Sequence, residues 1–401
     1  MKLSLLPPIW LLAIIAGLPQ ISETIYTPSL PDIARSLAVP DAWVEYTLTI
    51  YLAGFAVGTL FWGKLSDKFG RKPCLLAGLF IFILGCVGCY FSDTIHFLLI
   101  SRFIQAFGGS TGSVLGQAVA RDAFRGVERG KVYSTIAGAL SFSPAVGPFV
   151  GGIVDQMFGW HSIFLLLMMA GLLVFLSVIL KLPETHLNRI TTHPLKKMAL
   201  DLLKDKRVLG YAIVVAAVNG IQFSYYAEGS FYLIDLLGLS PSVYGLTFVG
   251  LALMAVLGAW LSRRLHDHLT SRAILWRGIL VQIGGASFFL IATLMCGALS
   301  APYLLSIIIT VGSMAIISAG SSMVIPNCLS LALEEYQHAV GTASSLFGFF
   351  YYTLISLFTL IMGFLHDGTL YPMPIYFFSI VLLISVVFLK MIGREEKRGL
   401  K

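Results

Sequence analysis

A succession of long apolar runs constrains this chain more than any other feature of its sequence. Each run is about 20 residues long, the length that a helix needs to cross the hydrocarbon core of a bilayer. The runs do not alternate in polarity, as the strands of a membrane barrel do. Charged residues make up 12% of the chain, about half the share found in soluble proteins. The sequence therefore predicts an all-α membrane protein.

Charged, proline-containing or glycine-containing breaks separate the runs into twelve predicted transmembrane helices. They cover residues 8–33, 42–62, 74–91, 95–120, 130–154, 160–182, 207–235, 241–261, 273–297, 302–331, 338–365 and 371–391. No small-residue cleavage pattern follows the first run, so we interpret it as a retained span rather than a signal peptide.

The placement of lysine and arginine predicts the orientation of these spans. When the spans are counted in order, all of the 27 lysines and arginines except Arg35 and Arg102 fall on the side of Lys2. Because basic residues are enriched in cytoplasmic loops, we expect both termini to be cytoplasmic. This bias explains the net charge of +7 without a nucleic-acid partner. The five cysteines are scattered in or beside spans, so we expect neither a disulfide framework nor a metal site.

The longest predicted cytoplasmic connection divides the spans into six and six. We expect an N-terminal six-helix bundle over residues 1–183, a linker over 184–206 and a C-terminal six-helix bundle over 207–401. After Pro194 the apolar residues of the linker recur at helical spacing, which predicts a short amphipathic helix on the membrane surface. Two similar bundles with a site at their interface are typical of secondary transporters.

Several motifs resemble one family of transporters. "GKLSDKFGRKP" (63–73) resembles the span 2–3 loop of the major facilitator superfamily, G-x-L-x-D-x-x-G-R-[RK]. "RFIQAFGGSTG" (102–112) resembles the span-4 motif of its proton-coupled members, and "GALSFSPAVGPFVGG" (138–152) resembles its span-5 antiporter motif. "IYTPSLPDIARSL" and "IPNCLSLAL…GTASSLFGFFYY" look like the Bcr/CflA-type multidrug exporters. The resemblance implies a drug:proton antiporter of the bacterial inner membrane that acts as a monomer, uses the proton gradient and needs no cofactor.

Three charged residues are predicted to lie well inside the hydrocarbon, namely Glu23, Arg102 and Glu228. Such charges cost about 2.5–3.5 kcal/mol each on insertion scales, so they usually have a function. At about 1.5 Å per residue, all three lie at a similar depth in the outer half of the membrane. We hypothesise that Glu23 carries a proton and that Arg102 controls its proton affinity. In the alternative interpretation, Arg102 binds backbone carbonyls and Gln105, and Glu23 reaches the outer surface.

The acid of span 1 departs from the pattern of Bcr-like relatives. In those relatives the acid lies two residues before the Tyr of a Y-x-P pattern, a position that Thr24 occupies here. Glu23 is rotated from it by about 100° around the helix. Glu228 also lies where the pattern usually has no acid. The proton and substrate roles therefore stay open between Glu23 and Glu228.

Aromatic and amide side chains near these charges predict a cavity for small amphipathic molecules. They are Tyr26, Gln105, Gln117, Asn219, Gln222, Tyr225, Tyr226, Asn327, Tyr351 and Tyr352. The alternative interpretation is that about half of them form interfacial belts or contacts between helices.

Two segments are predicted to control the conformational change. The first is the small-residue face of span 5, which we expect to approach span 8 closely: Pro144, Gly147, Pro148, Gly151 and Gly152. The second is the span 2–3 loop, where we expect Asp67 to face a helix N-terminus or Arg71. Gly63 and Gly70 are expected to permit tight turns in that loop.

Other classes of protein fit the sequence less well. "GGSTG" (108–112) matches the G-x-S-x-G nucleophile pattern, but Ser110 is in mid-span and the eight histidines all fall in loops or at span ends. We therefore expect no buried base and no enzyme. No P-loop is present, which excludes a self-contained ATP-driven pump. The alternative function is proton-coupled import or export of a metabolite, amino acid, peptide or siderophore.

Overall fold

The structure is a computed structural model that describes residues 6–186, 195–300 and 302–392. These ranges are almost entirely helical and contain no strand. Backbone proximity divides the chain into two compact units, Met1–His193 and Pro194–Lys401. The boundary falls within the predicted linker, of which residues 187–194 lie outside the described residues, as do 1–5 and 393–401 at the termini.

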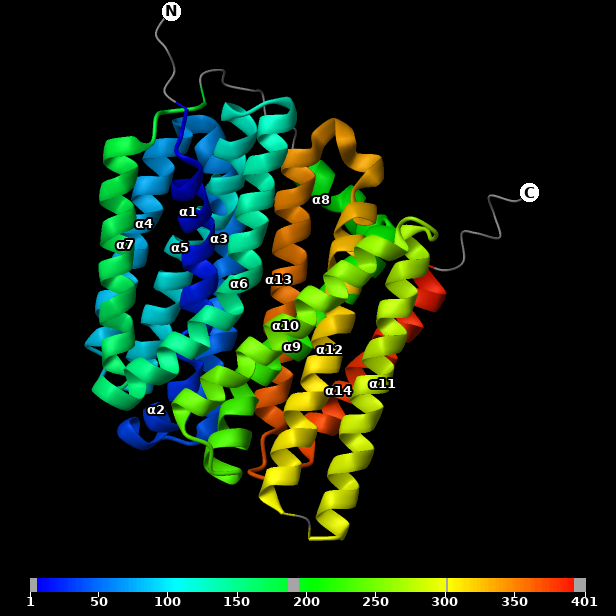
Figure 1. Cartoon of the computed structure of the whole chain (residues 1–401). Helices are drawn as coiled ribbons and strands as arrows, with labels where there is room; N and C mark the ends of the chain where they lie inside the picture. The colour runs from blue at the N-terminus through cyan, green and yellow to red at the C-terminus, as the bar shows by residue number, and fades with distance from the viewer. Residues whose placement is uncertain (1–5, 187–194, 301, 393–401) are drawn as a thin grey trace, which may run out of the picture. The chain divides into compact units, whose positions relative to one another are not determined.

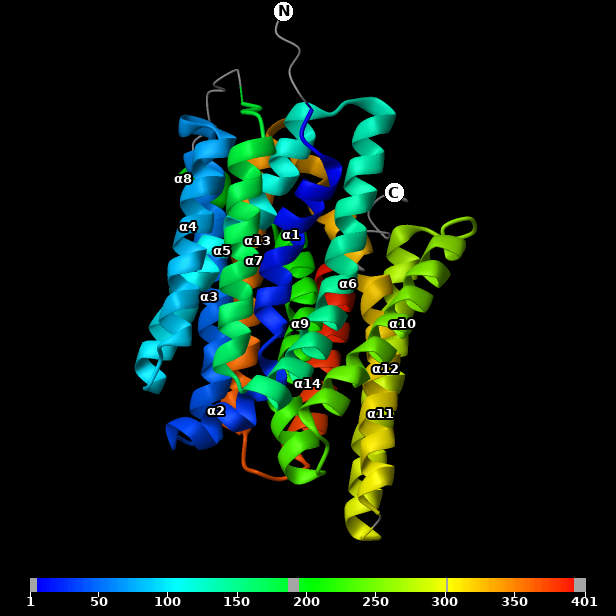
Figure 2. The same cartoon turned by 60° about the vertical axis from the view of Figure 1, so that its left-hand side comes forward.

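The first unit is a bundle of long helices (Figure 1). Its helices are α1 (Ile9–Thr24), α2 (Leu30–Leu37), α3 (Asp41–Phe69), α4 (Arg71–Tyr90), α5 (Ile95–Ala123), α6 (Gly126–Phe158) and α7 (His161–Lys181). α5 packs against both α3 and α4, and α1 packs against α5 and α6. In Figure 2, α1 lies between α6 and α7. In the apolar core of the segment Ile9–Leu37, which begins with α1, 67% of the residues are buried, compared with 33% in α7. α1 is therefore an interior helix and α7 a peripheral one.

The second unit contains seven helices in its described residues, α8 (Leu195–Lys204), α9 (Lys206–Ser230), α10 (Pro241–Leu265), α11 (Ser271–Ala298), α12 (Tyr303–Ala332), α13 (Val340–Leu365) and α14 (Pro372–Val387). Tighter or wider helical turns follow some of them, at Phe231–Leu236, Glu334–Ala339 and Phe388–Ile392. α9 is the interior helix of this unit, because 78% of the residues in the apolar core of Lys206–Leu236 are buried. It packs against α12, α13 and α14, and α11 packs against α12.

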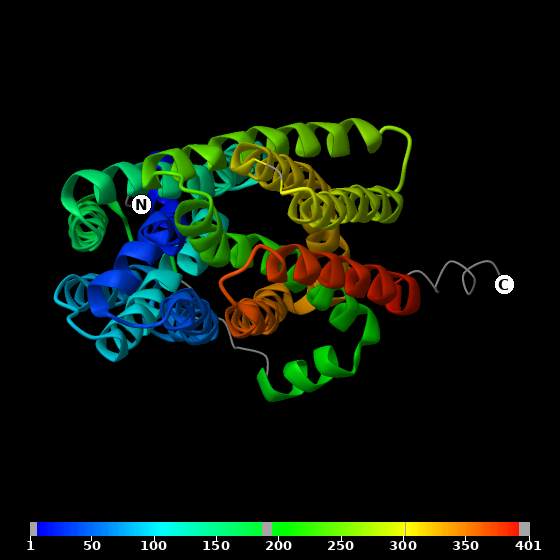
Figure 3. The same ribbon diagram turned by 90° about the horizontal axis from the view of Figure 1, so that it is seen from below.

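The helix expected after Pro194 is α8, and it belongs to the second unit. In Figure 3 the green start of this unit, which includes α8, lies at the edge opposite the yellow-green helices α10 and α11. Met198 and Leu202, one turn apart, are buried, whereas Leu203 is exposed. α8 packs against α9 and α13. Part of the apolar face of α8 therefore packs against other helices of the second unit.

The first predicted span is interrupted in the structure. α1 ends at Thr24, a short turn covers Thr27–Ser29, and α2 starts at Leu30. Pro28 and Pro31 lie at the starts of these two segments. A proline has no backbone N–H and disfavours a helical conformation in the residue before it, so two prolines three residues apart favour a break at this place. The prediction of an unbroken span over 8–33 is wrong in this respect.

Eleven helices in the described ranges are long and apolar enough to cross a membrane. α5 is not among them, although it is 29 residues long. Its apolar residues are interrupted by Arg102 and by the run of small and polar residues that follows, which lowers its mean hydropathy. Its side chains are nonetheless extensively buried against α3 and α4. A span that other helices surround needs less apolar surface than one that faces lipid.

The charged segment between the second and third predicted spans is mostly helical. α3 continues through it to Phe69, and α4 starts at Arg71. Gly70 alone makes the turn, with φ of 104°, a conformation that side chains rarely adopt. Gly63 lies inside α3, so the expectation that Gly63 permits a tight turn is wrong.

Candidate functional site

Arg102, on α5, is completely buried in the first unit. Its Nη1 donates hydrogen bonds to Gln105 Oε1 at 2.5 Å and to the Ser22 carbonyl oxygen at 3.3 Å. Its guanidinium carbon lies 4.0 Å from the ring centre of Tyr26 and 4.2 Å from that of Tyr51. The positive charge is thus held by dipoles and aromatic faces, which attract cations strongly away from water.

The two tyrosine rings beside Arg102 are fixed by their hydroxyl groups. The Tyr26 hydroxyl lies 2.9 Å from Thr47 Oγ1, and the Tyr51 hydroxyl donates to the Pro19 carbonyl oxygen at 3.0 Å. The second bond ties α3 to α1, and the first ties α3 to the break that follows α1. The guanidinium is therefore enclosed by rings whose positions α1 and α3 determine together.

Glu23 lies on the last turn of α1 and is buried. Its Oε1 has no hydrogen-bond partner among the described residues. Arg102 is near enough to interact with it electrostatically, but the ion pairs of the described residues do not include one between them. A buried carboxyl oxygen without a fixed partner can accept or release a proton without breaking another contact.

Gln105 is held inside the bundle at both ends of its amide. Its Oε1 accepts from Arg102, and its Nε2 donates to Cys86 Sγ at 3.1 Å. The contacts of Arg102 with Gln105 and with a backbone carbonyl are the ones that the structural interpretation of Arg102 expects. Both Gln105 and Tyr26, predicted as cavity residues, are fully buried. Gln117, the third such residue of this unit, is exposed, and its carbonyl oxygen accepts from the Tyr133 hydroxyl.

Glu228 belongs to the second unit, where it is buried on α9. His366 Nδ1 lies 2.9 Å from Glu228 Oε2, and the side chain of His366 is only 12% exposed. His366 is therefore half-buried rather than buried, and it lies at a span end, as the sequence predicts for the histidines. Its position one residue after α13 looked like a loop in the sequence, but the fold brings it back against α9. The sequence offers no local signal for a pair 138 residues apart.

A neutral polar cluster crosses the second unit between α9, α11 and α12. Gln222 Nε2 donates to Ser318 Oγ and Ser321 Oγ at 3.2 Å each, and Gln282 Nε2 donates to Ser321 Oγ at 3.0 Å. Gln282 is completely buried and was not among the predicted site residues. Its signal was a single amide inside an apolar run. These bonds fix three helices to one another without a charge.

The remaining predicted cavity residues lie elsewhere in the second unit. Asn327 Nδ2 donates to the Ser262 hydroxyl and to a backbone carbonyl, and so joins α12 to α10. Asn219 donates to a carbonyl of its own helix. Tyr225 and Tyr226 pack against Phe248, with ring centres 5.6 Å and 5.3 Å apart. Tyr351 and Tyr352, on α13, have ring centres 4.7 Å apart and are half-buried. A single pocket that contains all of them stays a prediction.

The glycines of α6 face α1 of the same unit. A side chain at Gly147 would collide with Thr24 Oγ1, and one at Gly151 would collide with the Ile25 carbonyl oxygen. The end of α1 and the residue after it occupy the space beside both glycines, so the Gly147–Gly151 step serves close approach within the first unit. The expected approach to span 8 stays a prediction. Pro144 and Pro148 lie within an uninterrupted α6. The small-residue face thus lets α6 pack directly against the end of α1, beside Glu23.

Arg71 connects three helices at the charged end of the first unit. Its side chain is 4% exposed and donates to Asp67 Oδ1 at 2.7 Å, Ser66 Oγ at 2.7 Å and Asp122 Oδ2 at 2.9 Å. The predicted contact between Asp67 and Arg71 is present. Asp122, at the end of α5, was not predicted, although it is one of only two acids in the strongly basic stretch 121–131. The guanidinium therefore holds the ends of α3 and α5 at the start of α4.

Glu184 binds the start of α4 from the segment after α7. Its Oε1 and Oε2 accept hydrogen bonds from the backbone N–H groups of Arg71 and Lys72, at 2.9 Å and 3.0 Å. The first N–H groups of a helix have no partner within the helix, and a carboxylate also interacts favourably with the helix dipole there. The carboxylate at this helix N-terminus is thus Glu184 and not Asp67.

Among the described residues of one unit, no three His, Cys, Asp or Glu side chains converge on a space for a metal ion. The five cysteines are free, and four of them are buried.

Comparison with known proteins shows the family. The model of the Major Facilitator Superfamily matches residues 12–360. The chain is 32% identical over 342 residues to a bicyclomycin resistance protein homolog of Haemophilus influenzae, with 84% of each protein covered. It is 26% identical over 377 residues to a chloramphenicol resistance protein of Pseudomonas aeruginosa, with 94% of this chain and 88% of that protein covered. The crystal structure of a D-xylose-proton symporter has a similar fold, with a TM-score of 0.75 at 16% identity over 95% of this chain and 96% of that one.

A family match of this extent confirms the resemblance that the motifs carry. It also confirms the predictions of a helical multi-pass membrane protein and of a transporter rather than an enzyme. The chain belongs to the Major Facilitator Superfamily.

Proposed function

We propose that this chain exports drugs or other small amphipathic molecules in exchange for protons, by alternating access. Relatives named for resistance to bicyclomycin and chloramphenicol support export of such molecules. Each inward-moving proton supplies about 2.3 kcal/mol per 100 mV of membrane potential. No cofactor or ATP is then required.

The observation that carries the proton-coupling part is the buried pair of Glu23 and Arg102. Glu23 Oε1 has no partner among the described residues, and the neighbouring Arg102 is held by neutral groups. A proton that binds Glu23 therefore changes the charge of this site without displacing a competing hydrogen bond. We assign Glu23 as the proton carrier and Arg102 as the group that sets its proton affinity.

The second buried acid is assigned a separate role. Glu228 already has His366 as a partner at 2.9 Å, so a change in its charge also affects that contact. We propose that Glu228 and His366 respond together to a cationic or hydrogen-bonding substrate in the second unit. The aromatic pair of Tyr351 and Tyr352 supplies flat apolar surface of the kind that amphipathic ligands use.

The proposed topology has twelve transmembrane helices, with α5 as the twelfth, arranged as two bundles of six. Both termini are cytoplasmic, because the basic residues of the sequence fall on that side. The protein is a monomer of the bacterial inner membrane, and residues 184–206 connect its bundles. The Arg71 cluster and the glycine face of α6 lie at contacts that the conformational change has to preserve or remake.

Transport in everted membrane vesicles tests this proposal. Vesicles with the wild-type protein should accumulate a bicyclomycin-like or chloramphenicol-like compound and should lose an imposed pH gradient when it is added. Glu23→Gln should abolish both effects, because an amide cannot exchange the proton. Glu128→Gln, the same change at an exposed acid on α6, is the matched control and should transport normally. Substrate uptake in the opposite direction, or full activity of Glu23→Gln, would contradict the proposal.

Arg102→Lys provides a second test of the same site. An ammonium lacks the planar surface that lies between Tyr26 and Tyr51, and it cannot reproduce the geometry of a guanidinium. We expect proton-coupled transport to fall at least about tenfold, which corresponds to about 1.4 kcal/mol. The pH dependence of the remaining activity should shift, because Arg102 acts through Glu23. A variant with normal rate and normal pH dependence would remove Arg102 from the coupling site.

A further inference from the structure

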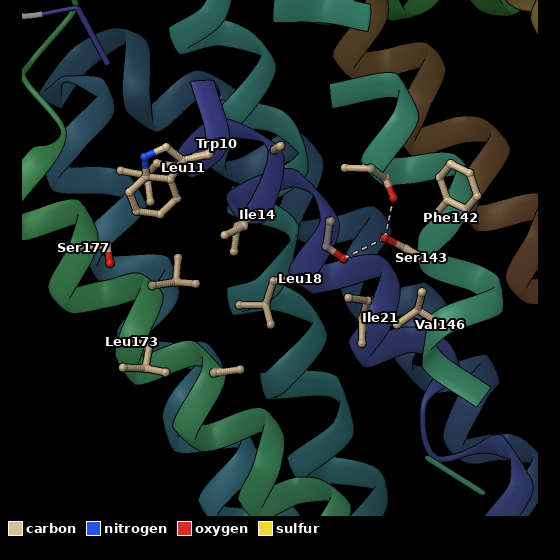
Figure 4. A pocket seen from close by; sticks show the side chains of 15 residues that line it. Trp10, Leu11, Ile14, Leu18, Ile21, Phe142, Ser143, Val146, Leu173 and Ser177 are labelled. Atoms are coloured by element: carbon tan, nitrogen blue, oxygen red, sulfur yellow. Dashed lines mark hydrogen bonds between the residues drawn. The ribbon is translucent and has the colours of Figure 1, made fainter. Parts of the chain in front are cut away.

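The first unit has an apolar groove that the proposed transport site does not use. Its volume is 480 Å³, within the range of about 300–1,000 Å³ for pockets that hold small ligands. Three helices supply its walls, with α1 between α6 and α7 (Figure 4). The lining residues are apolar except for Ser143 and Ser177. Ser143 already donates its hydroxyl to the Ala139 carbonyl oxygen.

Small residues on each of the three helices create the groove. Ala13 and Gly17 lie on α1, Ala139 on α6 and Ala170 on α7. Bulky side chains along its rims are open to the surroundings, with Phe142 59% and Leu173 66% exposed. An apolar groove with such exposed rims suits an acyl chain of the surrounding bilayer better than a polar molecule.

The groove has a direction and a length. From Trp10 to Ile21 it follows about 16 Å of α1, at about 1.5 Å per residue. The hydrocarbon core of a bilayer is about 30 Å thick, so this length is about that of one leaflet. The groove starts at the N-terminal end of α1, where α7 ends. It therefore matches one extended acyl chain that enters from this side.

A cation lies at the mouth of the groove. Lys181 follows Val174 and Ser177 on one face of α7, since these positions are separated by three and four residues. Lys181 Nζ lies 4.9 Å from the ring centre of Trp10, the first groove residue of α1. Lys72 Nζ donates to the Ile179 carbonyl oxygen, which brings a second ammonium to this end of α7. Tryptophan and lysine are the side chains that mark the level of lipid headgroups.

We propose that this groove is a binding site for an anionic phospholipid. One acyl chain fills the space between α1, α6 and α7, and the headgroup phosphate lies against Lys181 and Trp10. The apolar walls select an acyl chain, and the ammonium groups favour a headgroup with net negative charge over a zwitterionic one. The transported molecule is bound elsewhere in this scheme.

Photocrosslinking of the full chain in nanodiscs tests the site. The discs consist of phosphatidylethanolamine with a trace of phosphatidylglycerol that carries a diazirine in its acyl chain. We expect crosslinks on groove peptides of α1, α6 and α7, and we expect unlabelled phosphatidylglycerol to compete about fivefold better than phosphatidylethanolamine, the effect of one basic residue near the surface. Lys181→Gln should remove this preference, whereas Lys131→Gln, at an exposed lysine of α6, should retain it.

Variants that fill the groove with a larger side chain provide a second test of the lipid site. Ala170→Phe and, independently, Ala139→Phe should each suppress the groove crosslinks severalfold. Met169→Phe and Ala137→Phe place the same side chain at neighbouring exposed positions and should leave the crosslinks unchanged. Size-exclusion elution identifies a variant that fails to fold. If one of Ala170→Phe and Ala139→Phe fails to fold, the crosslinks of the other one test the proposal. Crosslinks that persist in a folded filling variant, equal competition by the two lipids, or competition by the transported compound alone would each overturn the proposal.

Discussion

α4 in the first unit and α11 in the second each follow a short basic connection, at corresponding places in the two halves of the chain. The start of α4 is bound by Glu184, whose carboxylate accepts from N–H groups more than 110 residues earlier in the sequence. The start of α11 is bound by Thr270, whose hydroxyl accepts from the N–H of Ala273 only three residues later. The first turn of α4 is thus bound by a distant charge through two hydrogen bonds, and the first turn of α11 by a local hydroxyl through one.

The difference determines how many helices depend on each connection. Arg71 extends the first connection to Asp67 of α3 and Asp122 of α5, so the ends of α3, α4, α5 and α7 meet in one cluster. A local cap such as Thr270 stabilises its own helix alone. A displacement at the first connection therefore affects a whole bundle, whereas a change at the second can stay within one helix.

Among changes at the two connections, Arg71→Ala should lower the stability of the protein the most. It leaves Asp67 and Asp122 without their shared cation. Breaking a fully buried ion pair costs about 3–5 kcal/mol, and we expect about 3 kcal/mol here, at the lower end, because the Asp67 side chain is 35% exposed. Arg263→Ala removes an exposed arginine at the second connection and should change stability by less than about 0.5 kcal/mol. Thermal unfolding in detergent measures both, and equal effects would erase the distinction between the connections.

Glu184→Ala should have the next largest effect on stability, about 2 kcal/mol. The variant loses three hydrogen bonds to a charged group, two from the start of α4 and one from the His186 N–H, as well as a favourable interaction with the helix dipole. Glu184→Gln keeps one acceptor oxygen, so its stability should lie between that of Glu184→Ala and that of the wild type. Hydrogen exchange at the first turn of α4 reports the loss directly. Unchanged protection of the Arg71 and Lys72 amides in Glu184→Ala would show that water replaces the carboxylate at no cost.

Thr270→Ala should have the smallest effect, about 1 kcal/mol, which is typical of the loss of an N-cap hydroxyl. Increased hydrogen exchange should be confined to the first turn of α11. Thr270→Asp offers a converse test, since an acid is also a good N-cap and should restore protection. If Thr270→Ala increases exchange in α10 or α12 as well, the second connection is as widely coupled as the first.

The sequence was sufficient for those features that depend on local composition. Apolar runs predicted the helices, and the spacing of four residues between Asp67 and Arg71 predicted their contact, because such residues are neighbours on a helix surface. The buried state of Glu23 and Arg102 followed from their places within apolar runs. These inferences needed only residues near one another in the chain.

Features that depend on distant partners were missed or misassigned. Glu184 and His366 look like ordinary loop residues, and only the fold brings them to α4 and to Glu228. The glycines of α6 were correctly identified as positions of close approach, but a small-residue pattern does not state which helix approaches. Gly63 and Gly70 were indistinguishable as turn candidates until the backbone showed that α3 continues through the first of them.

The break after α1 has an electrostatic consequence for Arg102. A helix carries about half a negative charge at its C-terminal end, where the last carbonyl groups lack partners within the helix. Arg102 binds one of these groups, the Ser22 carbonyl oxygen, so the end of α1 acts as a fractional counter-ion inside the membrane. This counter-ion is part of the backbone and cannot be titrated. Arg102 therefore stays partly neutralised whether Glu23 holds a proton or not.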